Sequence, residues 1–318
     1  MGVCSPMDKR KVLTYVLWVY GLTFGIAALF FLSGLGSNML LLSVFITGYM
    51  LFPLIAVFIV QKLIYKEAFA RPLLLTSKPS WWWLIAMFLP ILLVGLTALV
   101  AMLFPGTTLD LSLENYLNML DPASAAPMKD LFEVLPFHPL WLLAVQSFVG
   151  GITLNAVFAF GEEIGWRGFL LRELRALGFW KASLLIGLIW GPWHAPLTLF
   201  AGHNYPSTPV FGVLMMTIFC MLSSPILAFL TIKSRSIFPA AFFHGVMNGS
   251  ASLGIMIVAG GNPELLNSLT GLAGFIVLLA VNLIIFITTR STINQRYEAA
   301  FTQAEGTSKK HMNEQEQP

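Results

Sequence analysis

The chain has 318 residues, of which 57% are hydrophobic and only 10% are charged, and its mean hydropathy is +0.79. Soluble globular domains do not have such a composition, so the sequence predicts an integral membrane protein. The net charge is only +3, and the basic residues are spaced as topological anchors beside an anionic leaflet. We therefore expect the lipid bilayer as a partner and no nucleic acid.

Apolar windows of about 20 residues, the length that crosses a bilayer as a helix, recur along the whole chain. They predict an all-α polytopic membrane protein, with about eight transmembrane helices in one bundle over residues 1–290 and a polar cytoplasmic tail over 291–318. We expect the connection 105–137 to carry a helix at the outer interface. The predicted spans lie near residues 12–34, 38–60, 81–104, 139–161, 180–201, 209–231, 237–259 and 270–289.

The basic residues predict the orientation, because short cytoplasmic loops carry the excess of Lys and Arg. With the N-terminus inside, 17 of the 18 Lys and Arg residues are cytoplasmic, and only Lys129 lies on the other side. Both termini are then cytoplasmic. The short loops and the charge asymmetry favour a multi-pass protein of a bacterial plasma membrane.

Few ionisable side chains remain inside the predicted spans. A charged side chain at mid-bilayer costs about 3 kcal/mol, so it persists where a function or a partner compensates it. The polar residues lie on three different spans, in "AFGEEIGWRGFLL", "LIWGPWHAPLTLF" and "FFHGVMNGS". They are Glu162, Glu163, His194, His244 and Asn248.

Helix geometry separates the two glutamates. Residues Glu162 and Glu163 differ by about 100° around the helix axis, so they cannot both face one point. The spacing of Glu163 and Arg167 predicts an intrahelical ion pair, which leaves Glu162 free to face the bundle interior. His244 and Asn248 are four residues apart and share one face. Taken alone, Arg167 is better explained as an anchor that snorkels to the interface.

The predicted roles of the histidines differ with their positions. Pro192 and Pro196 bracket His194 and predict a break in the helix at the imidazole. A single intramembrane histidine can also be an interhelical hydrogen-bond partner and nothing more. We assign His138 and His203, at the outer ends of two spans, to solvated positions.

The polar set predicts amide hydrolysis by either of two routes. A carboxylate and an imidazole around one water form a general base, and a second imidazole with a carboxamide can donate hydrogen bonds to the oxyanion. Glu162, His194 and His244 also form a possible three-ligand set for a divalent metal such as zinc.

Three motifs resemble those of the CPBP group of intramembrane peptidases. They read "EEIGWR" (162–167), "WGPWH" (190–194) and "HGVMN" (244–248), in the order that the group shows. This group unites CAAX prenyl endopeptidases with Abi-type bacteriocin-processing and immunity proteins. The resemblance covers a peptidase core over about 139–260. Trp190 stands where the group usually shows Phe, an exchange expected to alter pocket width.

The resemblance implies the role of each residue. Glu162 and His194 would activate the water, His244 and Asn248 would stabilise the oxyanion, and the ion pair of the first motif would support them. The group has been described as metalloproteases, and a metal-free, glutamate-dependent mechanism is also argued for its CAAX members. Both accounts fit this sequence.

The expected function is that of an intramembrane endopeptidase acting on a peptide or membrane-protein substrate. We expect its cavity to open to the cytoplasmic half and the bond to be cut near the cytoplasmic membrane surface. One alternative is a proton- or ion-coupled transporter, against which the sequence shows no inverted repeat. Another is an inactive scaffold or immunity protein, which would be free to lose one of the four site residues.

Overall fold

Helices make up most of the protein in the computed structural model, which describes residues 7–315 and the side chains of residues 7–304. Within that range, the strands are two short segments, β1 (Thr108–Leu109) and β2 (Val258–Ala259), which pair antiparallel. The all-α prediction is therefore confirmed. In chain order the helices are α1 (Lys9–Leu32), η1 (Leu35–Ser37), α2 (Met39–Tyr49), α3 (Phe52–Val57), η2 (Phe58–Ile64), α4 (Trp81–Ala101), α5 (Glu114–Met119), α6 (Pro122–Val134), α7 (Pro139–Gly150), η3 (Gly151–Asn155), α8 (Ala156–Glu163), η4 (Ile164–Leu170), α9 (Leu171–Glu173), η5 (Arg175–Leu177), α10 (Phe179–Trp193), α11 (Ala195–Ala201), α12 (Pro209–Ser234), α13 (Phe238–Met256), η6 (Pro263–Asn267), α14 (Leu272–Thr289) and α15 (Ile293–Gln315).

The protein is a multi-pass membrane protein. Six helical segments of the described chain are long and apolar enough to cross a bilayer. A seventh span forms if α2 and the following α3–η2 segment, which meet at 41°, are counted together. Each of these seven matches a predicted span. The remaining predicted span is α13, which is helical but is not among these apolar segments.

Helix α13 can be less apolar because it lies inside the bundle. It packs against α4, α7, α8 and α12, so protein rather than lipid covers much of its surface. Gly245 allows the close approach: a Cβ there would lie 2.4 Å from the carbonyl oxygen of Gly151. Small residues at such contacts let transmembrane backbones approach each other closely.

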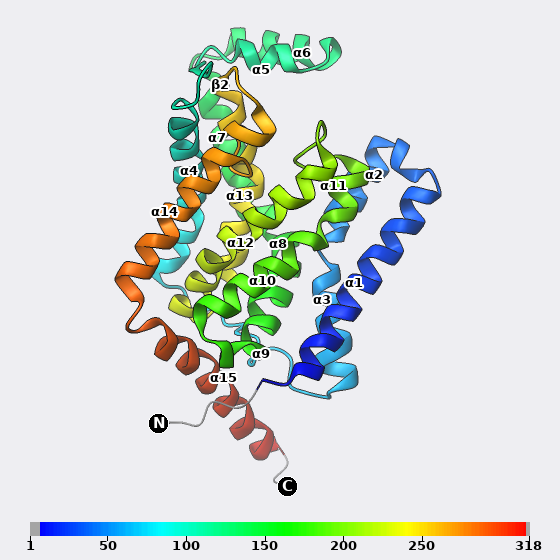
Figure 1. Ribbon diagram of the computed structural model, residues 1–318, viewed down its shortest axis with the longest axis vertical. Coiled ribbons are helices and arrows are strands. Elements are labelled where there is room, and N and C mark those ends of the chain that lie inside the picture. Colours follow the sequence, from blue (N-terminus) through cyan, green and yellow to red (C-terminus); the bar gives the residue numbers. More distant parts are fainter. Residues whose placement is uncertain (1–6, 316–318) are drawn as a thin grey trace.

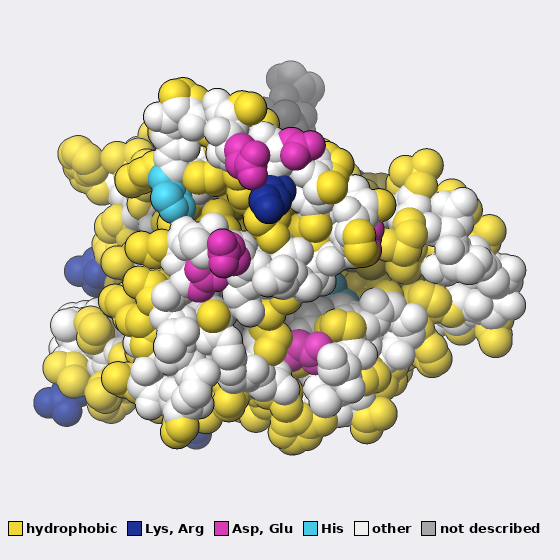
Figure 2. All heavy atoms as spheres, turned by 90° about the horizontal axis from the view of Figure 1, so that it is seen from above, with side chains coloured by type: hydrophobic (Ala, Val, Ile, Leu, Met, Phe, Trp, Pro, Cys, Tyr) yellow, Lys and Arg dark blue, Asp and Glu magenta, His cyan; other side chains and the backbone are white. Residues whose placement is uncertain are grey.

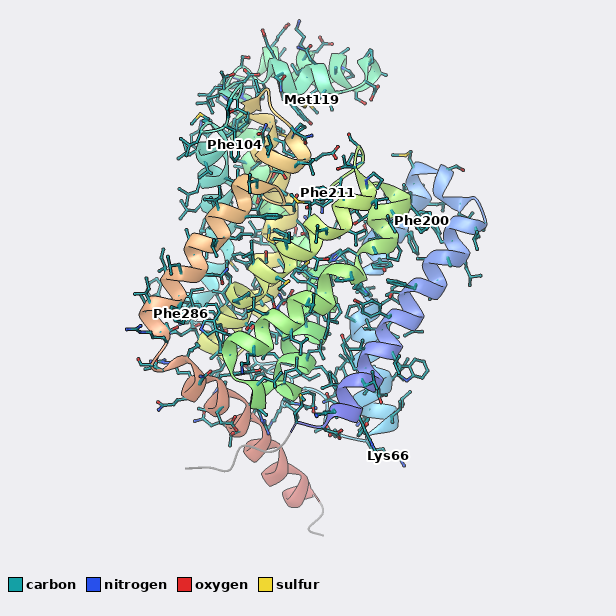
Figure 3. The ribbon with its side chains drawn as sticks, in the orientation of Figure 1. Lys66, Phe104, Met119, Phe200, Phe211 and Phe286 are labelled. Atoms are coloured by element: carbon teal, nitrogen blue, oxygen red, sulfur yellow. The ribbon has the colours of Figure 1, made fainter. Side chains whose placement is uncertain are left out.

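The outer surface of the bundle carries large apolar side chains. Phe200 is 67% exposed, Phe211 50% and Phe286 43%, and they lie on three different helices (Figure 3). A soluble monomer rarely exposes so much contiguous apolar surface, whereas a bilayer solvates it.

The bundle has two chemically different ends. The start of α1 and helix α15 lie at one end, and α5 and α6 lie across the other (Figure 1). Lys66, in the connection after η2, marks the first, and Met119, at the end of α5, marks the second (Figure 3). We call the end that carries Lys66 the basic end. The helix expected in the connection 105–137 is therefore observed as α5 and α6.

The tail forms α15 and packs onto the basic end. Ile293, Tyr297 and Phe301 are buried, and the hydroxyl of Tyr297 donates a hydrogen bond to the carbonyl of Leu171. The contact face recurs every four residues, which places these side chains on one side of the helix. Residues 316–318 lie outside the described chain.

Candidate functional site

A cavity of about 220 Å³ lies in the middle of the bundle, large enough for several water molecules. Glu162, His194, His244 and Asn248 all line it. They come from α8, from the junction of α10 and α11, and from α13. The four residues singled out in the sequence therefore surround one space.

Glu162 and Glu163 are the last two residues of α8 in a continuous helical rod, Pro139–Glu173. Two π-helical turns, η3 and η4, flank α8 on this rod. Such turns occur frequently at functional sites because they redirect side chains locally. Glu162 lines the cavity whereas Glu163 does not, as their separation around the helix predicts.

Two indole groups hold one oxygen of Glu162. Trp190 Nε1 donates to Glu162 Oε2 at 2.6 Å, and Trp166 Nε1 donates to the same oxygen at 3.2 Å. All three side chains are buried. A Phe at position 190 could not make this bond. The exchange noted in the sequence therefore changes the polar surroundings of Glu162, a consequence that motif reading did not reveal.

Glu163 contacts both Arg167 and His244. Arg167 donates from one terminal guanidinium nitrogen to Glu163 Oε1 at 3.0 Å, which confirms the predicted ion pair. His244 Nδ1 lies 2.8 Å from the same oxygen, a link between α8 and α13 that the sequence did not predict. Glu163 and Arg167 are fully buried, and the guanidinium carbon of Arg167 lies 4.5 Å from the ring centre of Trp190.

His194 lies where the helix breaks, between Trp193 at the end of α10 and Ala195 at the start of α11. Pro192 and Pro196 bracket it, as the sequence predicts. His194 Nδ1 lies 3.0 Å from the carbonyl oxygen of Trp190. Because a carbonyl only accepts, this contact assigns the proton to Nδ1 and leaves Nε2 with a free lone pair.

His203 was expected at a solvated position, but it is only partly exposed. Its ring is parallel to that of His194, with 6.3 Å between the ring centres, and it lines the cavity together with Asn204. The chain turns back at Gly202, where φ is +64°, and so places the connection over the cavity. Burial lowers the pKa of His203 to about 4. Gly202 next to His203 was the sequence signal for this turn. Helix periodicity does not extend into the connection, so it could not predict where His203 lies.

Asn248 lies one helical turn beyond His244 on α13, and its side chain is exposed to the cavity. This spacing lets its carboxamide and the His244 ring address one point. The carboxamide supplies two donors and an acceptor to that space.

The side-chain arrangement does not form a three-ligand metal site. Among residues 7–304, no group of three His, Cys, Asp or Glu side chains could hold a metal ion. In this arrangement Glu162, His194 and His244 therefore do not form the three-ligand zinc set considered from the sequence.

The cavity opens away from the basic end. Its lining includes Thr47 of α2, His203 and Asn204 between α11 and α12, and Thr270 just before α14. These positions lie toward the end that carries α5 and α6 (Figure 1). In the described chain, none of the lining residues belongs to the connections that hold the Lys and Arg clusters.

Comparison with known proteins gives two matches to this core. Residues 136–250 match the family described as type II CAAX prenyl endopeptidase Rce1-like. A protein of Methanococcus maripaludis named CAAX prenyl protease 2 is 31% identical over 108 residues. The aligned part covers 32% of this chain and 40% of that relative, so the chain spans well under half the length of the relative.

Proposed function

We propose that this protein, whose core is that of a CPBP-family intramembrane peptidase, hydrolyses a peptide bond inside the bundle. One observation carries the proposal: Glu162, His194, His244 and Asn248 line a single cavity within the matched segment 136–250. Intramembrane ionisable residues are costly, and their convergence on a space with room for water favours hydrolysis.

Glu162 and His194 are proposed to activate the water. The two indole donors orient the Glu162 carboxylate through Oε2, while Oε1 has no hydrogen-bond partner among the described residues. Oε1 is thus free to accept a proton from a water molecule in the cavity. The lone pair on His194 Nε2 is a second acceptor that can orient the same water.

His244 and Asn248 are proposed to stabilise the tetrahedral oxyanion. Oxyanion donors of this kind are worth about 3 kcal/mol each in known hydrolases. The Asn248 carboxamide donates directly, whereas His244 donates from Nε2 when its ring carries both protons. Glu163 is placed to balance that charge, since its carboxylate faces His244 Nδ1 at 2.8 Å.

The proposed reaction is balanced in its protons. The water oxygen bonds to the carbonyl carbon, and its proton passes to Glu162. The C–N bond then breaks, and the proton passes from Glu162 to the departing amine, which leaves the carboxylate ready for another water. The products are a shortened carboxylic acid and a free amine.

The test compares the wild type with Glu162→Gln, and Glu133→Gln serves as the control because Glu133 is an exposed residue of α6 that does not line the cavity. Membrane and released peptides from cells expressing each form are compared by mass spectrometry, and each purified form is incubated with a prenylated CAAX peptide and its unprenylated twin. We expect cleavage products with the wild type and the control and none with Glu162→Gln. Peptide profiles that do not depend on Glu162 would remove the proposal.

A further inference from the structure

We propose that the cavity receives its peptide from the non-cytoplasmic face of the membrane. The proposal rests on the peptidase function for the nature of the ligand, but its geometric basis is independent of catalysis. It reverses the side of access expected from the sequence.

The open side of the cavity lies at the end remote from the basic residues. Asn204, in the connection between α11 and α12, is exposed and also lines the cavity. His203 precedes Asn204 on the same connection, and Thr270, just before α14, also lines the cavity. A path therefore leads from this surface past His203 to His194 and Glu162.

The route from the cavity to the basic end is closed by aromatic packing. Trp166 follows Glu162 by one turn and is fully buried. Tyr15 of α1 packs edge-on against Trp166, with ring centres 6.1 Å apart, and against Phe169 at 4.7 Å. Phe169 and Tyr15 are also fully buried, so this layer leaves no exposed surface for a peptide.

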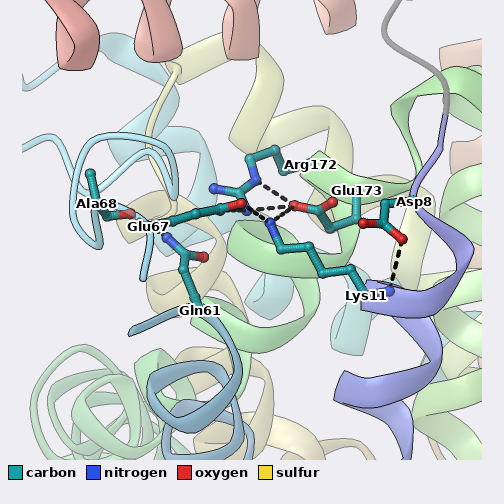
Figure 4. Close-up of polar contacts among 7 residues, drawn as sticks. All are labelled: Asp8, Lys11, Gln61, Glu67, Ala68, Arg172 and Glu173. Atoms are coloured by element: carbon teal, nitrogen blue, oxygen red, sulfur yellow. Dashed lines mark hydrogen bonds and ion pairs between the residues drawn. The ribbon is translucent and has the colours of Figure 1, made fainter. Parts of the chain in front are cut away.

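A network of ion pairs lies beyond the aromatic layer. Lys11 Nζ lies 2.5 Å from Glu67 Oε1 and 3.0 Å from Glu173 Oε1, and Arg172 pairs with both glutamates at 2.8 and 2.5 Å (Figure 4). These residues join α1, the connection after η2 and α9. Networks of several partly buried ion pairs contribute more to stability than isolated surface pairs. Ion pairs among three segments therefore hold the basic end closed.

Charge sets the side on which each end lies. Of the 18 Lys and Arg residues, 17 belong to the side that the sequence predicts to be cytoplasmic, and exposed basic residues near an anionic leaflet contribute about 1 kcal/mol of attraction each. Asp and Glu side chains gather over the middle of the opposite face (Figure 2). Residues Asp110, Glu114 and Asp121 belong to that end. The mouth of the cavity therefore faces away from the cytoplasm.

The ligand class follows from this placement. A peptide reaches Glu162 from the outside, so the substrate is an exported peptide or an external segment of a membrane protein. Peptides in the cytosol meet the sealed end. The cut is made deep in the bundle, because Glu162 lies nearer to Glu173 than to Pro139 on its helical rod.

Cysteine labelling tests the sidedness directly. In a background of Cys4→Ser and Cys220→Ala, Asn204→Cys marks the mouth and Lys78→Cys marks the basic end, and both positions are exposed. A charged, membrane-impermeant thiol reagent is applied to intact cells and, separately, to permeabilised cells. We expect Asn204→Cys to label in intact cells at least tenfold more than Lys78→Cys, and Lys78→Cys to label fully only after permeabilisation.

The reverse pattern, equal labelling of both positions in intact cells, or no labelling of the mouth from outside would each overturn the proposal. Ser207→Cys, an exposed position in the same connection as Asn204, provides a second mouth variant if Asn204→Cys does not accumulate. Cleavage in detergent has no sidedness, so it is measured in parallel. Absent cleavage with outside labelling refutes the peptidase function alone, whereas cleavage with reversed labelling refutes the route of entry alone.

Discussion

Trp190→Phe removes a single hydrogen bond from the proposed base while keeping an aromatic ring in place. The indole donates to Glu162 Oε2 at 2.6 Å, and both side chains are buried. Phe is the residue that the CPBP motif usually has at this position. The substitution leaves the Trp166 donor, at 3.2 Å, as the remaining partner of that oxygen. Glu162 then loses part of the contact that fixes its orientation.

The size of the effect follows from the strength of the bond. A hydrogen bond to a charged group contributes about 1.5–3 kcal/mol, which corresponds to about 10- to 150-fold in rate. Because Trp166 still donates to the same oxygen, we expect the lower limit, a decrease of about tenfold in kcat. The binding of substrate does not depend on this bond, so KM should change less than kcat.

The matched control is Trp193→Phe. Trp193 is also fully buried and lines the same cavity, but its indole nitrogen has no hydrogen-bond partner in the described chain. Steady-state cleavage by both purified variants is compared with the wild type, and thermal unfolding verifies that each is folded. Equal activities of the two variants would refute the role assigned to the Trp190 donor, because both lose the same ring volume.

Three further predictions concern packing, charge and pH. Gly245→Ala places a Cβ 2.4 Å from a backbone oxygen and should displace α13, giving a lower Tm and at least tenfold less cleavage, whereas Gly95→Ala, with no atom within 4 Å of its Cβ, should change neither. Glu163→Gln leaves the buried Arg167 without its carboxylate and should cost about 3 kcal/mol of unfolding free energy; an unchanged denaturation midpoint in detergent would contradict the ion-pair assignment. Burial lowers the pKa of His203 from about 6.5 to about 4, so the unfolded chain takes up its proton first and stability should fall as the pH drops through that window. Measured Tm values at pH 7 and pH 5 should therefore differ more for the wild type than for His203→Asn, and equal differences would count against this burial.

Much of the fold could be predicted from the sequence because a bilayer imposes strong local rules. Apolar length determines the spans, and all eight predicted spans are helices in the structure. The i, i+4 rule predicted the ion pair of Glu163 and Arg167, and the two prolines predicted the helix break at His194. Each of these inferences concerns residues close in the chain, where helix geometry alone sets the distance.

Only the tertiary structure determined the contacts between helices. The bond from Trp190 to Glu162 and the contact of His244 with Glu163 join residues 28 and 81 positions apart, and no periodicity encodes such a pairing. The position of His203 depends on a turn outside any helix. The open side of the cavity depends on how the rods diverge at one end and how aromatic rings and ion pairs close the other. A single span fixes which residues share its face, but only the packing of several spans decides what each face meets.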